Sequence, residues 1–390
     1  MSLPEDSPRA LRFDRREWGG AIGDLGTDLP LLFVLITALD LNGRNVLWTF
    51  GAMQIASGLF YRMPMPVQPL KAMATIAAAG GITAATFAAG GLVIGGLMLA
   101  LVLTGTLERL AKWVPLVAVR GLQLGLAIQL FRISPTLLNG GSYYFIPEWS
   151  SPVVGALVAV IALAMRGNTK VPAAVVIIPI ALVMFVLEGP PKDPLRLTPV
   201  EAFPDEFLTL SALKDGLLLL ALPQIGLSLG NAVIATRQVA RDLFPDRAPS
   251  ATTLGGTYAA MNLVAPFLGG IPTCHGSGGI AGHYAFGGRT GGSVIIYGAG
   301  YLLLGALFAV DAEFALALLT PPVLGGLLVV EALAMTQLAF RVERTPLQIG
   351  IVLVLGAIAA FSSMGYLIAL ALGIIVVPRL VAPPVASVTT

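Results

Sequence analysis

The residue types best suited to chemistry lie close together, within Pro272–His283 of this 390-residue chain. This stretch contains the only cysteine, Cys274, and both histidines, His275 and His283, among prolines and glycines. One cysteine and two histidines at this spacing lack further ligands nearby, so we expect no metal site and no cofactor. Adjacent side chains at a helix start point in different directions, so a Cys274–His275 nucleophile–base pair, and hence an enzyme, is disfavoured.

A second interrupted segment, Pro64–Lys71, precedes the first by 206 positions when Pro66 is set against Pro272. Proline and glycine breaks expose backbone N–H and C=O groups. Inside a membrane such breaks are tolerated only where the backbone lines a cavity or is buried in protein. Interrupted segments at matching positions of two inverted halves indicate a substrate site near the membrane midplane of a transporter.

The composition indicates a membrane protein, because 56% of residues are hydrophobic and only 11% are charged, against about 25% charged in soluble domains. Apolar stretches of roughly 17–25 residues recur along the chain. We predict an all-α polytopic fold with about 14 transmembrane segments in a 7+7 inverted repeat, in which segments 3 and 10 are half-helices. The predicted segments are 19–39, 45–62, 66–80, 84–106, 114–131, 151–166, 171–188, 213–236, 252–270, 273–286, 292–310, 314–336, 346–362 and 364–380.

The charge distribution predicts the topology. Most loop arginines and lysines fall on the side of the four N-terminal arginines, which by the positive-inside rule places both termini in the cytoplasm of a multi-pass protein of the inner or plasma membrane. No signal peptide is expected, and no nucleic-acid partner. No G-x-x-x-x-G-K-[ST] run occurs, which excludes direct use of ATP by this chain. The predicted parts are a tail (1–18), a first repeat (19–188), an extracytoplasmic linker (189–211), a second repeat (212–380) and a C-terminal tail (381–390).

Four motifs resemble those of the molybdate transporter family, which is related to the SulP anion transporters and to the bacterial uracil transporter fold. They are Gly23–Pro30, Pro64–Ala72, Pro223–Val233 and Pro272–Gly279, the last running on to Gly291. The resemblance implies a core subdomain of segments 1–4 and 8–11, a gate subdomain of segments 5–7 and 12–14, and a possible homodimer. The chain ends too soon after its last span for the STAS domain usual in sulfate-type relatives.

The two interrupted segments suit an anion on physical grounds. A helix that begins after an extended stretch presents free N–H groups and a partial positive charge at its start. Gly276 and Gly278 would let backbone approach a ligand closely, and the side chains of Gln68, Thr273 and Ser277 would add neutral donors. The competing interpretation is that the glycines only permit close helix packing.

Several further residues of these motifs have two possible roles. His275 either donates to the anion or titrates during transport, or it is a neutral histidine bonded to a backbone carbonyl. Cys274 either lines the site or is a small buried apolar residue. Gln224 and Asn231 lie on one face of the eighth segment, where the family resemblance places the site, and Asn231 is equally suited to bridge helices.

Charged residues within predicted spans are functional candidates by default. Lys71 either attracts the anion directly or, as we favour, forms a salt bridge with Asp28 or Asp24. These two aspartates flank Thr27 in the first motif and are the candidates for binding a coupling proton or sodium ion. Arg120 and Glu331 lie in predicted gate segments, and snorkelling toward the interface is the simpler interpretation for both, with a cross-repeat pair as the alternative.

These observations predict a secondary active transporter that imports molybdate, by proton symport and an elevator-type movement of core against gate. Sulfate or another small tetrahedral oxyanion remains an alternative substrate, and a channel-like anion conductor an alternative mechanism. In the uracil transporter the comparable segment carries an acidic residue that reads the base. No acid occurs between Asp215 and Asp242 here, so a nucleobase substrate is disfavoured.

Overall fold

The computed structural model describes residues 10–78, 80–138, 150–165, 174–188, 205–308, 320–342, 345–361 and 363–378. The predicted C-terminal tail, residues 1–9 of the N-terminal tail and residues 189–204 of the predicted linker lie outside these ranges. The described chain is mostly helical, as predicted.

The first half of the chain forms helices of unequal length and one short strand among its described residues. Local signals set the helix ends: Asn42 accepts a hydrogen bond from the Asn45 amide to start the second long helix, and Thr83 does the same for Thr86 in a later one. The elements are α1 (Arg15–Gly20), α2 (Leu25–Ala38), α3 (Gly43–Tyr61), β1 (Val67–Pro69), α4 (Lys71–Ala78), α5 (Ala84–Leu103), α6 (Thr106–Trp113), α7 (Leu116–Leu138), α8 (Ser150–Ala164) and α9 (Ala174–Glu188).

The second half repeats this order around a second strand. Its first long helix runs without a break over Leu210–Leu243 and includes two π-helical stretches. The elements are η1 (Asp205–Leu208), α10 (Leu210–Asp215), η2 (Gly216–Ala221), α11 (Leu222–Leu227), η3 (Ser228–Ala235), α12 (Thr236–Leu243), η4 (Pro245–Arg247), α13 (Ala251–Val264), η5 (Ala265–Leu268), β2 (Thr273–His275), α14 (Ser277–Ala285), α15 (Gly292–Phe308), α17 (Pro321–Ala339), α18 (Pro346–Phe361) and α19 (Ser363–Ile375).

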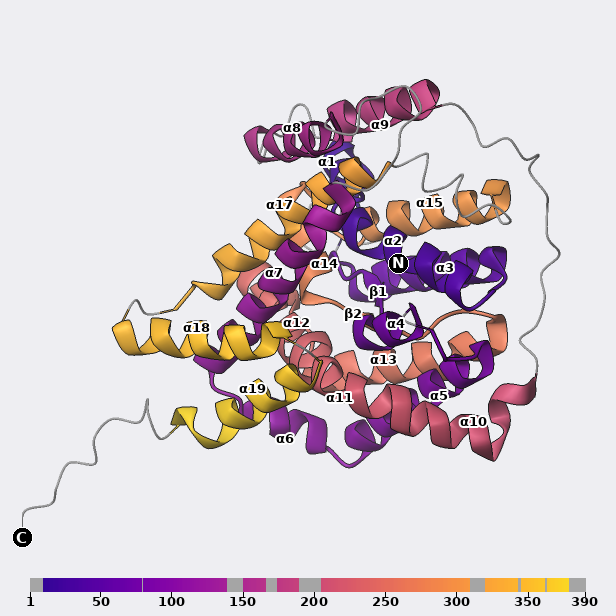
Figure 1. The fold of residues 1–390 in the computed structure, drawn as a ribbon. Helices are drawn as coiled ribbons and strands as arrows, with labels where there is room; N and C mark the ends of the chain where they lie inside the picture. Colours follow the sequence, from indigo (N-terminus) through magenta and orange to yellow (C-terminus); the bar gives the residue numbers. More distant parts are fainter. Residues whose placement is uncertain are drawn as a thin grey trace, which may run out of the picture.

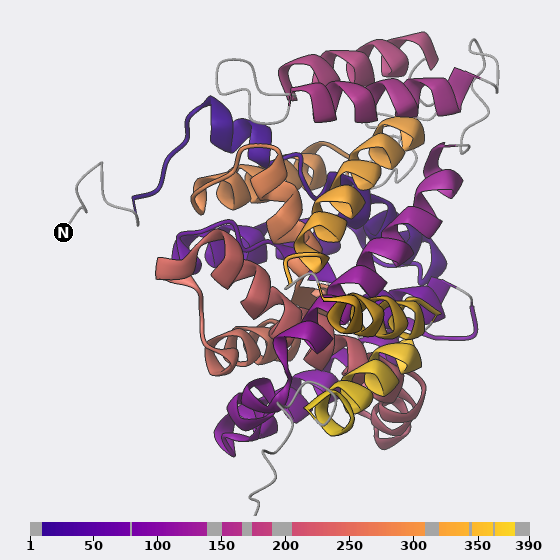
Figure 2. The same ribbon diagram turned by 90° about the vertical axis from the view of Figure 1, so that its left-hand side faces the viewer.

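The helices form two groups that lie side by side (Figures 1 and 2). The first, which we call the strand bundle, contains β1, β2, α1–α5 and α10–α15, with α3 packed on α15 and α5 on α13. The second, the α7 bundle, contains α7, α8, α9, α17, α18 and α19, with α7 packed on both α17 and α18. The two bundles meet where α17 contacts α2 and α14, and where α7 contacts η3.

The two strands pair with each other at the centre of the strand bundle. They are antiparallel, with Val67 opposite His275, Gln68 opposite Cys274 and Pro69 opposite Thr273. The short helices α4 and α14 therefore leave the ladder from opposite ends (Figure 1). The strands are a departure from the all-α prediction. Their physical reason is that proline-interrupted backbone cannot be helical, and buried N–H and C=O groups must then find partners in another chain segment.

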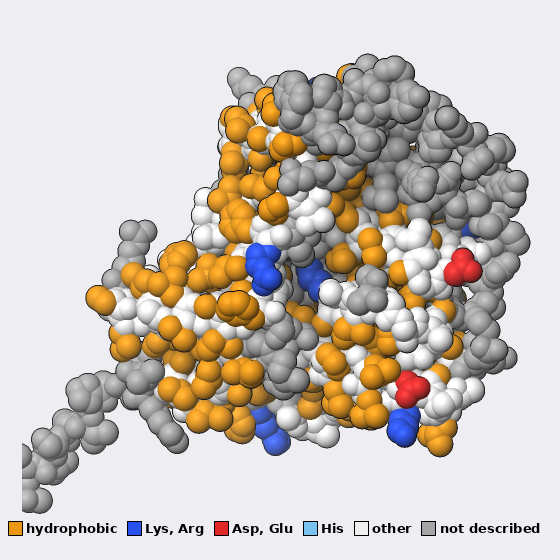
Figure 3. All heavy atoms as spheres, viewed as in Figure 1, with side chains coloured by type: hydrophobic (Ala, Val, Ile, Leu, Met, Phe, Trp, Pro, Cys, Tyr) orange, Lys and Arg blue, Asp and Glu red, His pale blue; other side chains and the backbone are white. Residues whose placement is uncertain are grey.

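The surface of the described chain is suited to lipid. Four helices are long and apolar enough to cross a membrane by length and composition, namely Ala84–Leu103, Leu116–Leu138, Leu210–Leu243 and Pro321–Ala339. Large apolar side chains point outward, and hydrophobic atoms cover much of the face in Figure 3, with few charges between them. The predicted number of membrane crossings stays a prediction.

Candidate substrate site at the paired strands

Two buried amide side chains hold the strands in place. The Gln54 Nε2 donates to the Val67 carbonyl at 2.6 Å, and its Oε1 accepts from the Val67 amide at 2.8 Å. Asn262 makes the equivalent pair of bonds to the Thr273 carbonyl and amide, at 2.6 and 3.0 Å. Sequence analysis missed both clamps, although each is an amide residue in the helix that precedes an interrupted segment.

The Leu210–Leu243 helix positions the starts of α4 and α14. The Gln224 Oε1 accepts from the backbone amides of Ala72 and Met73, at 3.0 and 3.3 Å, and so caps α4. Asn231 lies in η3 of the same helix, and its Oδ1 accepts a hydrogen bond from the Ser277 hydroxyl at 2.5 Å. Both predicted residues therefore contact the starts of the two short helices. Gln224 acts as a helix cap rather than a free donor, and Asn231 bridges helices.

The first turn of α14 lacks such a cap. Its N-cap residue is Gly276, which has no side chain. Within the described residues, the backbone N–H groups of Ser277, Gly278 and Gly279 have no hydrogen-bond partner. Three free donors at a helix start, together with the partial positive charge of that end, form the standard setting for a bound anion. The starts of α4 and α14 were expected to be alike, but only the start of α4 is capped by a side chain.

The glycines around this turn make room for side chains of the protein. A Cβ at Gly276 would overlap the Gln68 amide, and one at Gly278 would overlap the Glu331 carboxylate. A Cβ at Gly279 would overlap the Asp24 carboxylate. The packing interpretation therefore holds for these positions, and it has a chemical consequence. Two of the three side chains that the glycines admit are acidic, and both lie at the positive end of α14.

Gln68 links the charges at the site. Its Nε2 donates to both carboxylate oxygens of Asp24, at 2.6 and 2.8 Å, and its Oε1 accepts from the Lys71 ammonium at 2.8 Å. The expected salt bridge of Lys71 with Asp24 or Asp28 is therefore wrong, because no such pair lies within 4.0 Å among the described ion pairs. Lys71 begins α4 three positions after Gln68 of β1, and its ammonium bonds to that amide instead.

Two more carboxylates lie fully buried nearby. The Asp28 Oδ2 accepts from the Tyr297 hydroxyl at 3.0 Å, and the Glu331 Oε2 accepts from the Thr27 hydroxyl at 2.6 Å. The other oxygen of each, Asp28 Oδ1 and Glu331 Oε1, has no partner in the described part of the chain. The described residues form no group of three or more His, Cys, Asp or Glu side chains able to hold a metal ion.

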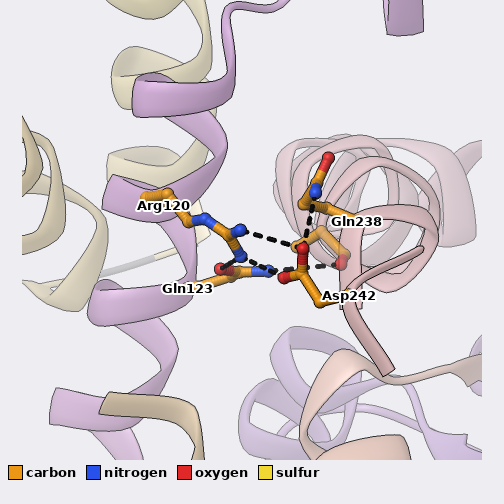
Figure 4. Close-up of polar contacts among 5 residues, drawn as sticks. Arg120, Gln123, Gln238 and Asp242 are labelled. Carbon is orange, nitrogen blue, oxygen red and sulfur yellow. Dashed lines mark hydrogen bonds and ion pairs between the residues drawn. The ribbon is translucent and has the colours of Figure 1, made fainter. Parts of the chain in front are cut away.

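The interpretation that Arg120 and Glu331 extend toward the membrane–water interface is wrong, because both side chains are buried inside the protein. They do not pair with each other either. Arg120 of α7 crosses between the bundles and forms an ion pair with Asp242 of α12, while Gln123 and Gln238 complete the cluster (Figure 4).

Cys274 and His275 have structural contacts. The His275 Nδ1 lies 3.3 Å from the Pro66 carbonyl, and its Nε2 lies 2.9 Å from the Thr257 hydroxyl. A carbonyl only accepts, so Nδ1 is the donor, and the histidine braces β1 against α13. Cys274 is buried within the apolar cluster around β1. Of the predicted neutral donors, Thr273 contacts the Met53 sulfur at 3.6 Å.

Comparison with known proteins agrees with the four motifs. A profile of the family described as "Molybdate transporter of MFS superfamily" matches residues 16–130 and 216–335, more than half of the chain. The chain belongs to this molybdate transporter family. Molybdate transporter 2 of Arabidopsis thaliana is 32% identical over 361 residues, covering 78% of this chain and 76% of that protein. Molybdate transporter 1 of the same plant is 30% identical, covering 80% and 77%.

Solved structures share the fold of this family member. The transmembrane domain of the cyanobacterial bicarbonate transporter BicA superposes with a TM-score of 0.58 at 16% identity, covering 91% of this chain and 97% of that one. The murine Slc26a9 anion transporter in its inward-facing state gives a TM-score of 0.63 at 12% identity, covering 94% and 69%. The predicted SulP-type fold is confirmed. The relatives are named as transporters, which agrees with the prediction that the chain is not an enzyme.

Proposed function

We propose that this protein imports molybdate by proton symport, with the strand bundle moving against the α7 bundle in an elevator-type cycle. The observation that carries the proposal is the uncapped start of α14, where three backbone N–H groups have no partner among the described residues. The proposed ligand is a tetrahedral oxyanion, and backbone donors at a helix start suit its oxygens without requiring an arginine cluster. Family membership supports molybdate as that oxyanion.

Lys71 and Gln68 complete the proposed binding set. Gln68 lies against Gly276, directly before the free turn, and the Lys71 ammonium is bonded to Gln68. The lysine charge is thus one side chain away from α14. Anion binding there would gain from this charge and from the helix end, both in a site with little water.

The charge balance supports coupling to protons. Asp24, Asp28 and Glu331 are fully buried carboxylates, and Lys71 is the cation that acts on all three. If all three were ionised, a dianion would enter a site that already carries excess negative charge. Protonation of a carboxylate removes one repulsive charge, so proton uptake and anion binding would favour each other. In this proposal the protein lies in the cell membrane with both termini in the cytoplasm, as a possible homodimer.

The test is uptake of labelled molybdate into proteoliposomes, with and without an inward proton gradient and with excess sulfate. We expect accumulation that requires the proton gradient and that sulfate barely inhibits. Efficient competition by sulfate would indicate a general oxyanion carrier. Dependence on a sodium gradient would make sodium, and not the proton, the coupling ion. Current without accumulation would indicate a channel.

Site variants make this test specific. Lys71→Gln removes the cation nearest to the proposed site while keeping a donor group, and we expect at least tenfold weaker molybdate binding. The matched control is Lys112→Gln, which makes the same change at an exposed residue of α6. Equal binding by both variants would contradict the placement of the site.

A further inference from the structure

Glu331 connects the two bundles at the proposed site. It lies on α17 of the α7 bundle, yet its Oε2 accepts a hydrogen bond of 2.6 Å from Thr27 of α2, which belongs to the strand bundle. The same carboxylate lies against Gly278 in the first turn of α14. Of the three buried carboxylates at the site, it is the one contributed by the α7 bundle.

The second oxygen of Glu331 is the unusual feature. Oε1 is buried and has no partner in the described residues, and it is the atom that faces Gly278. A buried, unpartnered carboxylate oxygen is costly. Here it lies beside a helix start whose N–H donors are also unpartnered. The carboxylate therefore lies where an oxyanion of the substrate would lie.

No cation is dedicated to Glu331 within the described chain. The charges that act on it most strongly are those of Asp24 and Lys71, and Lys71 is bonded to Gln68. The elements packed against α17 are α2, α7, α8 and α14. Their titratable or charged residues within the described chain all have other partners. They are Asp28, which bonds to Tyr297, Arg120, which pairs with Asp242, Arg132, which donates to the Ala360 carbonyl, His283, which bonds to Ser293, and Tyr284, whose ring lies against the Arg289 guanidinium.

The other two carboxylates are less suited to exchange a proton during transport. Both oxygens of Asp24 accept from Gln68, so this carboxylate is held as an acceptor. Asp28 faces Tyr297 within the strand bundle, and it would travel with the substrate. Relative movement of the bundles would leave the surroundings of both largely unchanged. The same movement would separate Glu331 from Thr27, Gly278 and the aspartates.

We propose that Glu331 carries the coupling proton and competes with the substrate for the start of α14. This inference rests on the proposed function and names the residue that performs the coupling. Protonated Glu331 gives up the helix end, and the dianion takes it. After the bundles move, the anion leaves, and the proton is lost from the Glu331 carboxyl to water on the cytoplasmic side. Once the bundles have returned, the ionised carboxylate again occupies the helix end until it is protonated.

The test compares Glu331→Gln with wild type in proteoliposomes whose membrane voltage is clamped at zero. Glutamine keeps an acceptor for Thr27 but is permanently neutral. We expect wild type to accumulate molybdate up to about tenfold for one proton and a one-unit inward pH gradient. We expect Glu331→Gln to exchange labelled for unlabelled molybdate across the membrane, yet to reach a ratio of only one. A pH indicator trapped in the lumen should report proton entry with molybdate in wild type and none in the variant.

Two further variants make the outcome decisive. Asp246→Asn neutralises an exposed carboxylate of η4 and should accumulate molybdate as wild type does. Asp28→Asn neutralises the neighbouring carboxylate and, whatever its transport rate, should still bring protons in with the molybdate that it transports. If Glu331→Gln accumulates molybdate with wild-type proton entry, or if Asp28→Asn alone loses coupling, the inference about Glu331 is overturned while the proposed function stands. If wild type itself fails to accumulate molybdate, the proposed function fails instead.

Discussion

The ion pair between Arg120 and Asp242 gives the sharpest prediction about stability, because it joins the two bundles (Figure 4). Arg120 reaches from α7 to α12, where both terminal nitrogens of its guanidinium contact the Asp242 carboxylate. The two side chains are 3% and 12% exposed. Removing either partner leaves the other with one amide neighbour, Gln123 for the arginine and Gln238 for the aspartate.

The expected cost follows from this burial. Breaking a buried ion pair by removing one partner costs about 3–5 kcal/mol, because an uncompensated charge stays buried. The entropy of unfolding is about 2.1 cal/mol/K per residue, so a chain of 390 residues has about 0.8 kcal/mol/K. Each single alanine variant should therefore lower Tm by about 4–6 °C. The double variant Arg120→Ala, Asp242→Ala should fall by much less than the sum, because neither charge is then left alone.

The chain contains its own reporter for this measurement. Cys274 is the only cysteine and it is buried at the centre of the strand bundle, so a thiol-reactive fluorophore reports unfolding of detergent-solubilised protein without engineered sites. Arg241→Ala, at an exposed arginine of the same helix, is the control and should shift Tm by less than about 1 °C. Additive losses in the double variant, or single losses no larger than the control, would refute the reasoning that the pair is a buried contact between bundles.

Three further predictions test the scaffold around the site. Gln224→Leu removes the cap of α4 and should cost about 0.5–2 kcal/mol in the same unfolding assay, whereas Gln224→Glu keeps the acceptor but adds negative charge and should weaken molybdate binding more than it lowers Tm. Asn262→Ala leaves the Thr273 amide and carbonyl unpaired and should cost about 2–5 kcal/mol, and an unchanged Tm would contradict the clamp. Burial raises the pKa of Glu17, and backbone hydrogen bonds from Arg289, Ser293 and Thr290 lower it less. Because the folded protein holds the Glu17 proton more tightly than the unfolded chain, protonated Glu17 stabilises the fold at pH below 4.5. This stabilisation is lost as the pH rises through the raised pKa. Tm should therefore fall between pH 4.5 and the raised pKa in wild type, and not in Glu17→Gln.

The sequence predicts the parts of the site that depend on backbone breaks. The prolines of the two interrupted segments exclude regular helix, and their matching positions indicate that the two segments meet. The structure pairs these segments as β1 and β2. The family resemblance also places Gln224 and Asn231 of segment 8 at the site, and in the structure they contact the starts of α4 and α14. Their role in binding stays a prediction. The pairing of the two segments can be predicted because proline and glycine act locally, through the backbone.

The partners of polar side chains could not be predicted in the same way. Lys71 was expected to pair with an aspartate, but the Gln68 amide lies between the lysine and Asp24. For Glu331 the expected outcomes were snorkelling toward the membrane interface, as the simpler interpretation, or a pair with Arg120. The contact with Thr27 comes from a residue 304 positions away, and periodicity within one helix carries no information about such a contact.

The starts of α4 and α14 differ in a way that bears on the proposed substrate site. The clamps of Gln54 and Asn262 are equivalent, so the two strands are held alike. The difference lies in the Leu210–Leu243 helix, where Gln224 occupies the N–H groups of α4 but Asn231 contacts only the Ser277 hydroxyl at α14. One positive helix end is thereby used for structure and the other is left for a ligand. Glu331 of the α7 bundle lies beside the uncapped start of α14. The proposed exchange of an anion against this carboxylate requires that position.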